Sequence, residues 1–251
     1  MKNILIVGNW KMNPESLAEA RIIFDGLFKD IKKEKNKEIV LCPPFIYLCE
    51  GLAIKQSKVK FGAQDCFWHQ KGAYTGEISP LMLKNIRCEY VIIGHSERRR
   101  YFGETNEIIN EKIKSALKIG LKPILCIGEN ESERENLSVV LENQLINSLT
   151  GLSTGQITRI NIAYEPVWAI GTDNPCLPDD AMAAYLLIKK ILLKTGSRAV
   201  VDRVKVLYGG SIKLYNAVDY IKKAGMDGLL VGGASINVSE FLKIVESINI
   251  S

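Results

Sequence analysis

The sequence predicts an α/β fold, namely a single-domain (β/α)8 barrel spanning residues 1–251. Three observations support it: eight short, continuously apolar runs alternate with longer amphipathic segments, the 251-residue length suits one barrel, and no Pro/Ser-rich linker divides the chain. Strands that are apolar at every position are covered on both faces, as in a parallel sheet. Eight right-handed strand–helix units of this kind can close into a barrel.

The predicted strands are the apolar runs themselves. They are Ile4–Val7, Glu38–Cys42, Val59–Ala63, Tyr90–Ile93, Pro123–Ile127, Asn161–Tyr164, Val204–Tyr208 and Gly228–Val231. An open doubly wound sheet is the alternative, and it usually carries Gly-x-Gly-x-x-Gly after its first strand. The first run here is followed by Gly8-Asn9-Trp10-Lys11, which does not match and therefore favours the barrel.

Apolar residues recur at helical spacing between these strands. The predicted buried helix faces are Leu17, Ala20, Ile23, Phe24 and Leu27; Ile109, Ile113, Ala116 and Leu117; and Ala184, Leu187, Ile188 and Ile191. Thr105 and Ser79 stand where they can cap helices, and Pro80 suits a first helical position. The alternation of strand and helix therefore continues along the chain.

Composition excludes several classes of function. The net charge of +5 is mild, and Arg98–Arg100, the longest basic run, is too short for a nucleic-acid surface. The six cysteines include no Cys-x-x-Cys pair and the chain has two histidines, which argues against a zinc site and for free thiols. No apolar stretch has the length that spans a bilayer. We expect a cytoplasmic protein that binds neither metal, nucleic acid nor membrane.

Barrel enzymes carry their sites at the carboxyl ends of the strands, so the residues after each strand are the candidates for chemistry. Gly209-Gly210-Ser211 and Gly232-Gly233-Ala234 follow the last two strands. Glycines let the backbone approach a ligand and present its N–H groups, and these two loops are the usual phosphate site of this fold. Plain tight turns are the alternative, but two such turns in these positions favour a phosphate site.

Lys11 and His95 follow the first and fourth strands. A lysine there would be a fixed cation at the barrel mouth, although an ordinary surface lysine is the alternative. His95 precedes Ser96-Glu97-Arg98-Arg99, which can start a helical turn whose positive end keeps the imidazole neutral. A structural histidine is the alternative here, and His69, which has no comparable context, is expected to be one.

Glu165 ends the sixth strand and precedes the apolar stretch Pro166–Ile170, which leads to Gly171-Thr172. A solvent loop this apolar is typical of a lid that closes over a small ligand and excludes water. Drying would make the Glu165 carboxylate a better base. A buried strand extension is the alternative, which Pro166 disfavours.

Four segments together resemble the signatures of triosephosphate isomerase. They are Asn9-Trp10-Lys11-Met12-Asn13, His95-Ser96-Glu97-Arg98-Arg99, Tyr164-Glu165-Pro166-Val167-Trp168-Ala169-Ile170-Gly171-Thr172 and Tyr208-Gly209-Gly210-Ser211. The resemblance covers essentially the whole chain. It implies a (β/α)8 TIM barrel that interconverts D-glyceraldehyde 3-phosphate and dihydroxyacetone phosphate through an enediolate, in glycolysis and gluconeogenesis, without a cofactor.

The resemblance also implies a role for each site residue. Glu165 would be the base and His95 a neutral electrophile, while Lys11 would stabilise the enediolate with help from Asn9. The remaining roles are phosphate binding by the backbones of Gly171, Ser211, Gly232 and Gly233, support of Lys11 and Ser96 by Glu97, clamping of the base by Leu230 and Ile170, and a lid of Pro166, Val167, Trp168, Ala169, Ile170, Gly171 and Thr172.

The segment Gly72–Glu77 resembles the interface loop of this family, which inserts into the partner subunit near Lys11 and His95. The resemblance therefore implies a homodimer, with contacts through Tyr74, Thr75, Gly76 and Glu77. From the residues alone, a flexible exposed loop is the alternative.

Two positions depart from the family pattern. Asp65 replaces the usual asparagine and adds a charge near the proposed interface. Asp173-Asn174 replaces the usual glycine and lysine at the far end of the lid, where Pro175 and Cys176 follow. These departures leave the proposed catalytic residues untouched and bear on the interface and on lid kinetics.

Two other functions share parts of this pattern. Another phosphate-binding barrel, such as a sugar-phosphate isomerase or a lyase of amino-acid biosynthesis, would keep the glycine turns but need not have Glu165-Pro166 with an apolar lid. An inactive scaffold barrel would be expected to lose Lys11, His95 or Glu165, and all three are present. The sequence therefore predicts an active isomerase of a small triose phosphate.

Overall fold

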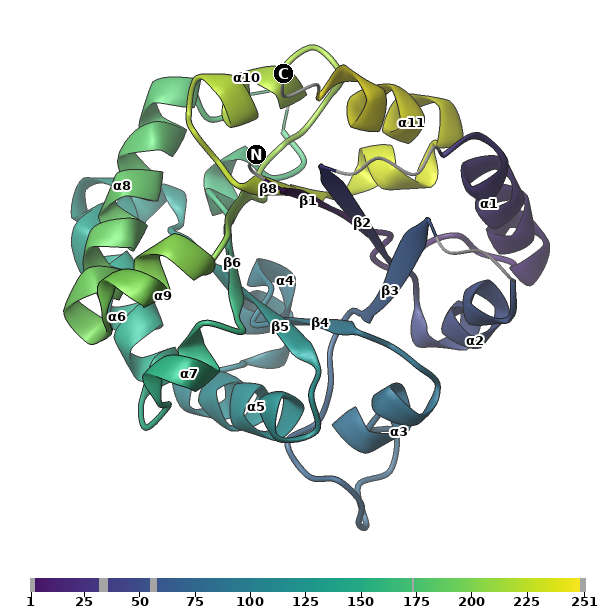
Figure 1. Ribbon diagram of the computed structural model, residues 1–251, viewed down its shortest axis with the longest axis horizontal. Coiled ribbons are helices and arrows are strands. Elements are labelled where there is room, and N and C mark those ends of the chain that lie inside the picture. Colours follow the sequence, from purple (N-terminus) through teal and green to yellow (C-terminus); the bar gives the residue numbers. More distant parts are fainter. Residues whose placement is uncertain (1–2, 32–35, 55–57, 173, 249–251) are drawn as a thin grey trace.

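Eight parallel strands form a closed barrel in the computed structural model, which describes residues 3–31, 36–54, 58–172 and 174–248 (Figure 1). The strands are β1 Ile4–Asn9, β2 Lys37–Cys42, β3 Val59–Ala63, β4 Tyr90–Ile93, β5 Lys122–Ile127, β6 Asn161–Tyr164, β7 Val206–Tyr208 and β8 Gly228–Val231. They follow one another around the barrel in chain order, and β8 pairs with β1. The predicted fold class is confirmed.

Helices surround the barrel on its outer face (Figure 1). They are α1 Leu17–Asp30, α2 Phe45–Ala53, α3 Pro80–Asn85, α4 Ser96–Phe102, α5 Asn106–Lys118, α6 Leu137–Leu149, α7 Thr154–Ile157, α8 Pro178–Thr195, α9 Arg198–Arg203, α10 Ala217–Lys222 and α11 Val238–Ser247, with short 3₁₀ turns η1 Glu131–Asn136, η2 Val167–Ala169 and η3 Gly233–Ile236. A helical crossover is what a parallel neighbour requires.

The strands are apolar at successive positions because each one faces two cores. Leu5 and Val7 of β1 point into the barrel interior. Ile4 and Ile6 of the same strand point outward and pack with helix residues such as Phe24 of α1. Alternation of side chains across a strand therefore fills both cores, which explains why the runs lack a polar face.

Most of the predicted element details are confirmed. Ser79 and Thr105 cap α3 and α5 by accepting hydrogen bonds from backbone N–H groups, and Ile113 on the predicted face of α5 is fully buried. Two expectations are wrong. Leu17, the first residue of α1, is 39% exposed, and Val204 lies outside β7 because its N–H donates to the Val200 carbonyl and closes α9.

The six cysteines have free thiols, and all but Cys49 are buried. Among the described residues, no three or more His, Cys, Asp or Glu side chains are grouped to hold a metal ion. Within the same described ranges, no helix has both the length and the apolar character needed to cross a bilayer.

Candidate active site

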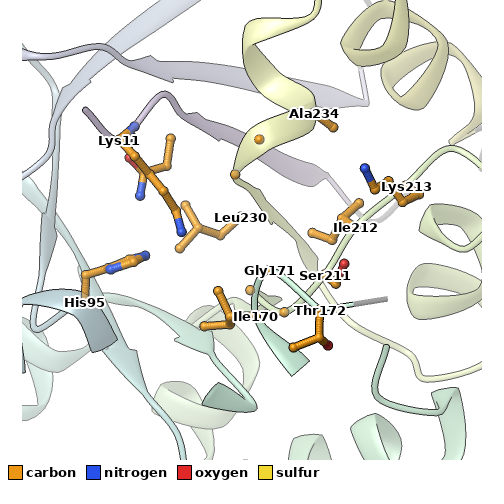
Figure 2. A pocket seen from close by; sticks show the side chains of 15 residues that line it. Lys11, His95, Ile170, Gly171, Thr172, Ser211, Ile212, Lys213, Leu230 and Ala234 are labelled. Carbon is orange, nitrogen blue, oxygen red and sulfur yellow. Dashed lines mark hydrogen bonds between the residues drawn. The ribbon is translucent and has the colours of Figure 1, made fainter. Parts of the chain in front are cut away.

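A cavity of about 190 Å³ opens at the carboxyl ends of the strands (Figure 2). Its lining residues are Asn9, Lys11, His95, Ile170, Gly171, Thr172, Gly209, Gly210, Ser211, Ile212, Lys213, Leu230, Gly232, Gly233 and Ala234. They follow or end β1, β4, β6, β7 and β8, so closure of the barrel gathers segments from the whole chain. Most of the predicted site residues thus meet in one place.

Lys11 enters the cavity from an uncommon backbone conformation. Its φ of 54° lies in the left-handed region, which costs a residue with a β-carbon of order 1–3 kcal/mol. Two side chains hold it there: Asn9 Oδ1 accepts from the Lys11 N–H at 3.0 Å, and Gln64 Nε2 donates to the Lys11 carbonyl at 2.8 Å. The ammonium group then donates to Glu97 Oε1 at 2.6 Å. Both ends of the residue are therefore fixed.

His95 is buried at the N-terminal end of α4, with 6% of its surface exposed. Its Nδ1 accepts a hydrogen bond from the backbone N–H of Glu97 at 3.2 Å. An accepting Nδ1 carries no proton, so the ring is neutral and Nε2 carries the N–H. Nε2 lies 3.2 Å from Glu165 Oε1, and Figure 2 shows the ring pointing into the cavity. The tautomer therefore presents a hydrogen-bond donor to whatever the cavity holds.

Glu165 follows β6 and is 1% exposed. Its Oε2 accepts from the Ser96 backbone N–H at 2.8 Å, while Oε1 is buried with no hydrogen-bond partner among the described residues. The carboxylate does not line the main cavity. It lines a neighbouring one of about 450 Å³, together with Ser96, Arg99 and Cys126. The predicted base thus lies beside His95 but is turned toward Ser96.

The predicted phosphate-binding residues all line the main cavity. Gly171 and Ser211 lie across it from His95 in Figure 2, and Gly232 and Gly233 line it as well. A Cβ at Gly232 would meet Lys11 Cε at 3.4 Å. Backbone N–H groups of such turns suit an anion.

The predicted lid begins with η2, which is folded against the neighbouring loop. Trp168 Nε1 donates to Glu129 Oε1 at 2.7 Å, and the Arg134 guanidinium lies 4.0 Å from the centre of the Trp168 ring. Gly171 has φ +69°, which favours glycine, and Thr172 Oγ1 accepts from the Asn174 N–H at 3.2 Å. Asp173 lies outside the described residues.

The predicted dimer segment extends away from the barrel beside α3 (Figure 1). Tyr74 is 42% exposed, and its ring stacks on His69 at a centroid distance of 5.0 Å. Thr75, Gly76 and Glu77 are exposed. The segment thus presents one aromatic side chain and two polar ones to its surroundings.

Asp65 lies two residues after the end of β3, on the chain that leads to this segment. It belongs to a charge cluster with Arg98, Glu104 and Lys112. Lys112 Nζ lies 2.7 and 2.8 Å from the two Asp65 oxygens and 2.5 Å from Glu104 Oε1. Arg98 Nε lies 2.5 Å from Glu104 Oε1 and 3.1 Å from Asp65 Oδ2. Burial raises the pKa of Asp65 to about 6. Burial opposes ionisation of Glu104 as well, but Lys112 and Arg98 hold its pKa below the ordinary value.

Several functional contacts cannot be found by residue type alone. Gln64, which holds the Lys11 carbonyl, and the Ser96 N–H, which holds Glu165, are such contacts. Lys213 also lines the cavity, two residues beyond Ser211. Its signal is its place in the glycine-rich turn after the seventh strand, where a cation would face a bound anion.

Comparison with known proteins gives one consistent family. Residues 4–248 match the family model described as triosephosphate isomerase. The chain is 45% identical over 251 residues to the triosephosphate isomerase of Dictyoglomus thermophilum, covering 98% of this chain and 100% of that protein. It is 46% identical over 247 residues to that of Dehalococcoides mccartyi, with 97% and 96% covered, and 43% identical over 249 residues to that of Carboxydothermus hydrogenoformans, with 98% and 99% covered.

Proposed function

Because the chain belongs to the triosephosphate isomerase family, we propose that the cavity at the barrel mouth is its active site and that Glu165 is the catalytic base. The reaction is the reversible interconversion of D-glyceraldehyde 3-phosphate and dihydroxyacetone phosphate, an aldose–ketose isomerisation of glycolysis and gluconeogenesis. The observation that carries the assignment of the base is its contact with His95, 3.2 Å away at the edge of the cavity.

Glu165 is proposed to remove a proton from one substrate carbon and return it to the neighbouring carbon. The electron pair of the broken C–H bond then forms the C–C double bond of an enediolate. The carboxylate has to leave the Ser96 N–H, which it accepts at 2.8 Å, and turn into the cavity to reach the substrate. Glu165 is 1% exposed where it lies against Ser96, and closure of the lid would exclude water from it after this turn.

His95 and Lys11 are proposed to stabilise the negative charge that develops on the two substrate oxygens. The Nε2–H of His95 donates to these oxygens and can pass a proton between them. Lys11 supplies a fixed positive charge, oriented by Asn9 at one end and by Glu97 at the other. Donors aimed at developing charge are typically worth 10²–10³-fold in rate.

The phosphate group is proposed to bind at the other end of the cavity, on backbone N–H groups of Gly171, Ser211, Gly232 and Gly233. Lys213 lines the same cavity and adds positive charge near it. Closure of the segment Pro166–Thr172 would bring the Gly171 N–H onto the phosphate and press Ile170 and Leu230 around the base. Binding energy from the phosphate would then be used to exclude water from the reacting carbons.

A coupled assay of glyceraldehyde 3-phosphate turnover, with Glu165→Gln as the test variant, examines this proposal. We expect kcat to fall by at least about 10²-fold, since glutamine fills the same space but cannot accept the proton. KM should largely persist because the phosphate contacts are unchanged. A variant with near-normal kcat would exclude Glu165 as the base.

The protein is further proposed to be a homodimer that joins through the carboxyl-end loops of its first four strands. Each of these loops or the helix after it exposes a large apolar side chain: Met12, Ile46, Tyr74, Tyr101 and Phe102 are 94%, 77%, 42%, 67% and 68% exposed. Covering such a set of side chains on both copies favours a closed two-fold dimer. The surface adjoins Lys11 and His95, so the partner would brace the active site.

Replacement of Lys71–Glu77 by a short polar turn tests the dimer. Sedimentation should then give monomers, and kcat should fall by at least about tenfold, which corresponds to about 1.4 kcal/mol of barrier. A fully active monomer would show that the interface does not organise the site. We also propose that residues 1–251 act as one catalytic domain and that the protein works in the cytoplasm, where its free thiols would persist.

A further inference from the structure

Arg99 lies next to His95 and Glu165, the two groups proposed to move protons. The mechanism proposed above gives it no role. Its guanidinium makes three hydrogen bonds. Nε donates to the Gly94 carbonyl at 2.8 Å, Nη1 to Asn106 Oδ1 at 2.8 Å and Nη2 to the Cys126 carbonyl at 3.1 Å. A planar guanidinium can hold several acceptors at once in a fixed arrangement, which a lysine ammonium group on its flexible chain does less well.

The two backbone acceptors stand where the ladder between β4 and β5 ends. The last paired residues are Ile93 and Leu125. Gly94 directly follows β4, and Cys126 is the next residue of β5. Arg99 therefore joins the two strands just beyond their last direct pairing. Its hydrogen bonds hold the two strand ends together at the barrel mouth, where the backbone pairing between β4 and β5 has ended.

The Gly94 and Cys126 carbonyls, which Arg99 holds, both belong to backbone next to the proposed catalytic residues. Gly94, with φ +74°, is the residue before His95. The residue after Cys126 is Ile127, whose carbonyl accepts from the Glu165 N–H at 2.7 Å. A Cβ at Gly128 would overlap the Glu165 carbonyl oxygen, which shows how closely this strand end supports the base. The clamp thus connects the backbone that carries His95 to the backbone on which Glu165 rests.

Arg99 has no ion-pair partner among the described residues, although much of it is buried. All of its hydrogen bonds within the described part of the chain go to neutral oxygens. Burial lowers the pKa of Arg99, and attraction to the Cys126 thiol, Glu165 and Glu104 opposes the effect. Arg99 and Glu165 also line the same cavity. A buried cation is costly unless its donors are satisfied, and these three oxygens supply that for Arg99.

We propose that Arg99 is a positioning residue for the isomerisation, clamping the strand ends that hold His95 and Glu165. This inference rests on the proposed role of Glu165 as the base. The Glu165 carboxylate is held by the Ser96 N–H at 2.8 Å and lies 3.2 Å from the His95 ring, so Arg99 acts on it through the backbone.

The alternative is that Arg99 only satisfies carbonyls and stabilises the fold. Two matched variants separate the roles. Arg100→Gln removes the neighbouring exposed guanidinium, which lies 5.1 Å from the Tyr101 ring centre. Asn106→Ala removes one hydrogen bond of Arg99 but neither the carbonyl clamp nor the charge. Both variants should keep the kcat and the KM of the unchanged protein.

The test measures kcat and KM for Arg99→Gln and Arg99→Lys in the coupled assay. For Arg99→Gln we expect kcat to fall about 10- to 100-fold, the scale of a misplacement near 1 Å, with KM little changed. A role limited to fold stability would lower the melting temperature and leave the kcat of the folded protein unchanged. Arg99→Lys keeps the charge but loses the planar guanidinium, so its kcat should also fall.

Two results would overturn the role of Arg99. One is an Arg99→Gln enzyme whose kcat matches that of the unchanged protein, whatever its melting temperature. The other is an Arg99→Lys enzyme with unchanged kcat, which would exclude the clamp even where Arg99→Gln does not fold. Failure of the proposed function would give different results. The unchanged protein and Arg100→Gln would lack turnover, or Glu165→Gln would retain it. In either case Glu165 would not be the base, and the proposed role of Arg99 would be excluded with it.

Discussion

Two lysines of this chain have opposite surroundings, and the contrast separates a charge proposed to act in catalysis from a structural one. Lys11, at the barrel mouth, has a side chain that is 26% exposed and donates to one carboxylate oxygen, Glu97 Oε1. Lys112, in α5, is 2% exposed. Its ammonium group meets three oxygens, two from Asp65 and one from Glu104.

An ammonium group has three N–H donors. Those of Lys112 are filled by the protein, so its charge is already neutralised and can do little for a ligand. Within the described residues, Lys11 Nζ donates to Glu97 Oε1 alone, which leaves two donors for the cavity that it lines. The strained backbone at φ 54° is held by Asn9 and Gln64. Lys11 at the barrel mouth thus differs from Lys112 in the buried cluster because it is held in place and still has N–H donors available for a ligand. The three predictions below test that distinction by stability or by rate.

Lys112→Met should have the largest effect, and the effect should be on stability. Methionine has a similar length but leaves the Asp65 and Glu104 carboxylates without their shared cation. Removing one partner of a buried ion pair typically costs 3–5 kcal/mol. Urea denaturation should show that loss in the free energy of unfolding, while the kcat of the folded fraction stays close to normal.

Lys114→Met is the matched control, since Lys114 lies on the same helix in an exposed pair with Glu111 at 3.0 Å. Such a helix pair contributes about 0.3–0.5 kcal/mol. Equal destabilisation by the two variants would show that the cluster is not a structural unit, and the contrast with the mouth would fail.

Lys11→Met should act on rate and leave stability nearly unchanged. Loss of one preorganised donor to developing charge costs roughly 10²–10³-fold, or about 2.7–4 kcal/mol of barrier. The coupled assay measures kcat/KM, and thermal melting measures stability. Lys190→Met, at an exposed position of α8, provides the control. A Lys11→Met protein that melts far below normal and retains its kcat/KM would reverse the assignment of the two lysines.

The fold could be predicted from the sequence because its determinants are local. The strand runs are apolar throughout since each strand fills an inner and an outer core, as Leu5 and Ile4 do in β1. The candidate catalytic residues could be located because they stand at strand ends, and a barrel brings all of these ends together. Both inferences need only the order of residues along the chain.

The buried cluster could not be predicted, because its members are joined by packing across elements. Lys112 lies beside Ile113 in a helix and reads as one of many solvated lysines. The sequence marks Asp65 as a charge near the interface, whereas the structure buries it against α5, 47 positions along the chain from Lys112. A backbone donor such as the Ser96 N–H cannot be predicted from residue type, because nearly every residue has one. Contacts of this kind depend on where two segments meet.

Asp65→Asn tests the smallest of the three effects, the cost of the buried charge itself. Burial raises the pKa of Asp65 from 3.8 to about 6, and Glu104 adds to the rise, although Lys112 and Arg98 oppose it. The folded chain therefore holds a proton on Asp65 more tightly than the unfolded chain does, so protonation favours folding. In the unchanged protein this contribution is complete below pH 3.8 and is lost as pH rises through about 6. Asparagine does not titrate.

We therefore expect the free energy of unfolding of Asp65→Asn to match that of the unchanged protein near pH 4 and to exceed it by up to about 3 kcal/mol at pH 8, the energy of about two pKa units. Urea denaturation at a series of pH values measures the difference. Asp25→Asn, which neutralises an exposed carboxylate on α1, is the control and should show no gain that grows between pH 4 and pH 6. A variant less stable than the unchanged protein at pH 8 would mean that the ion pairs of Asp65 outweigh its burial, and that Lys112 needs both of its carboxylates.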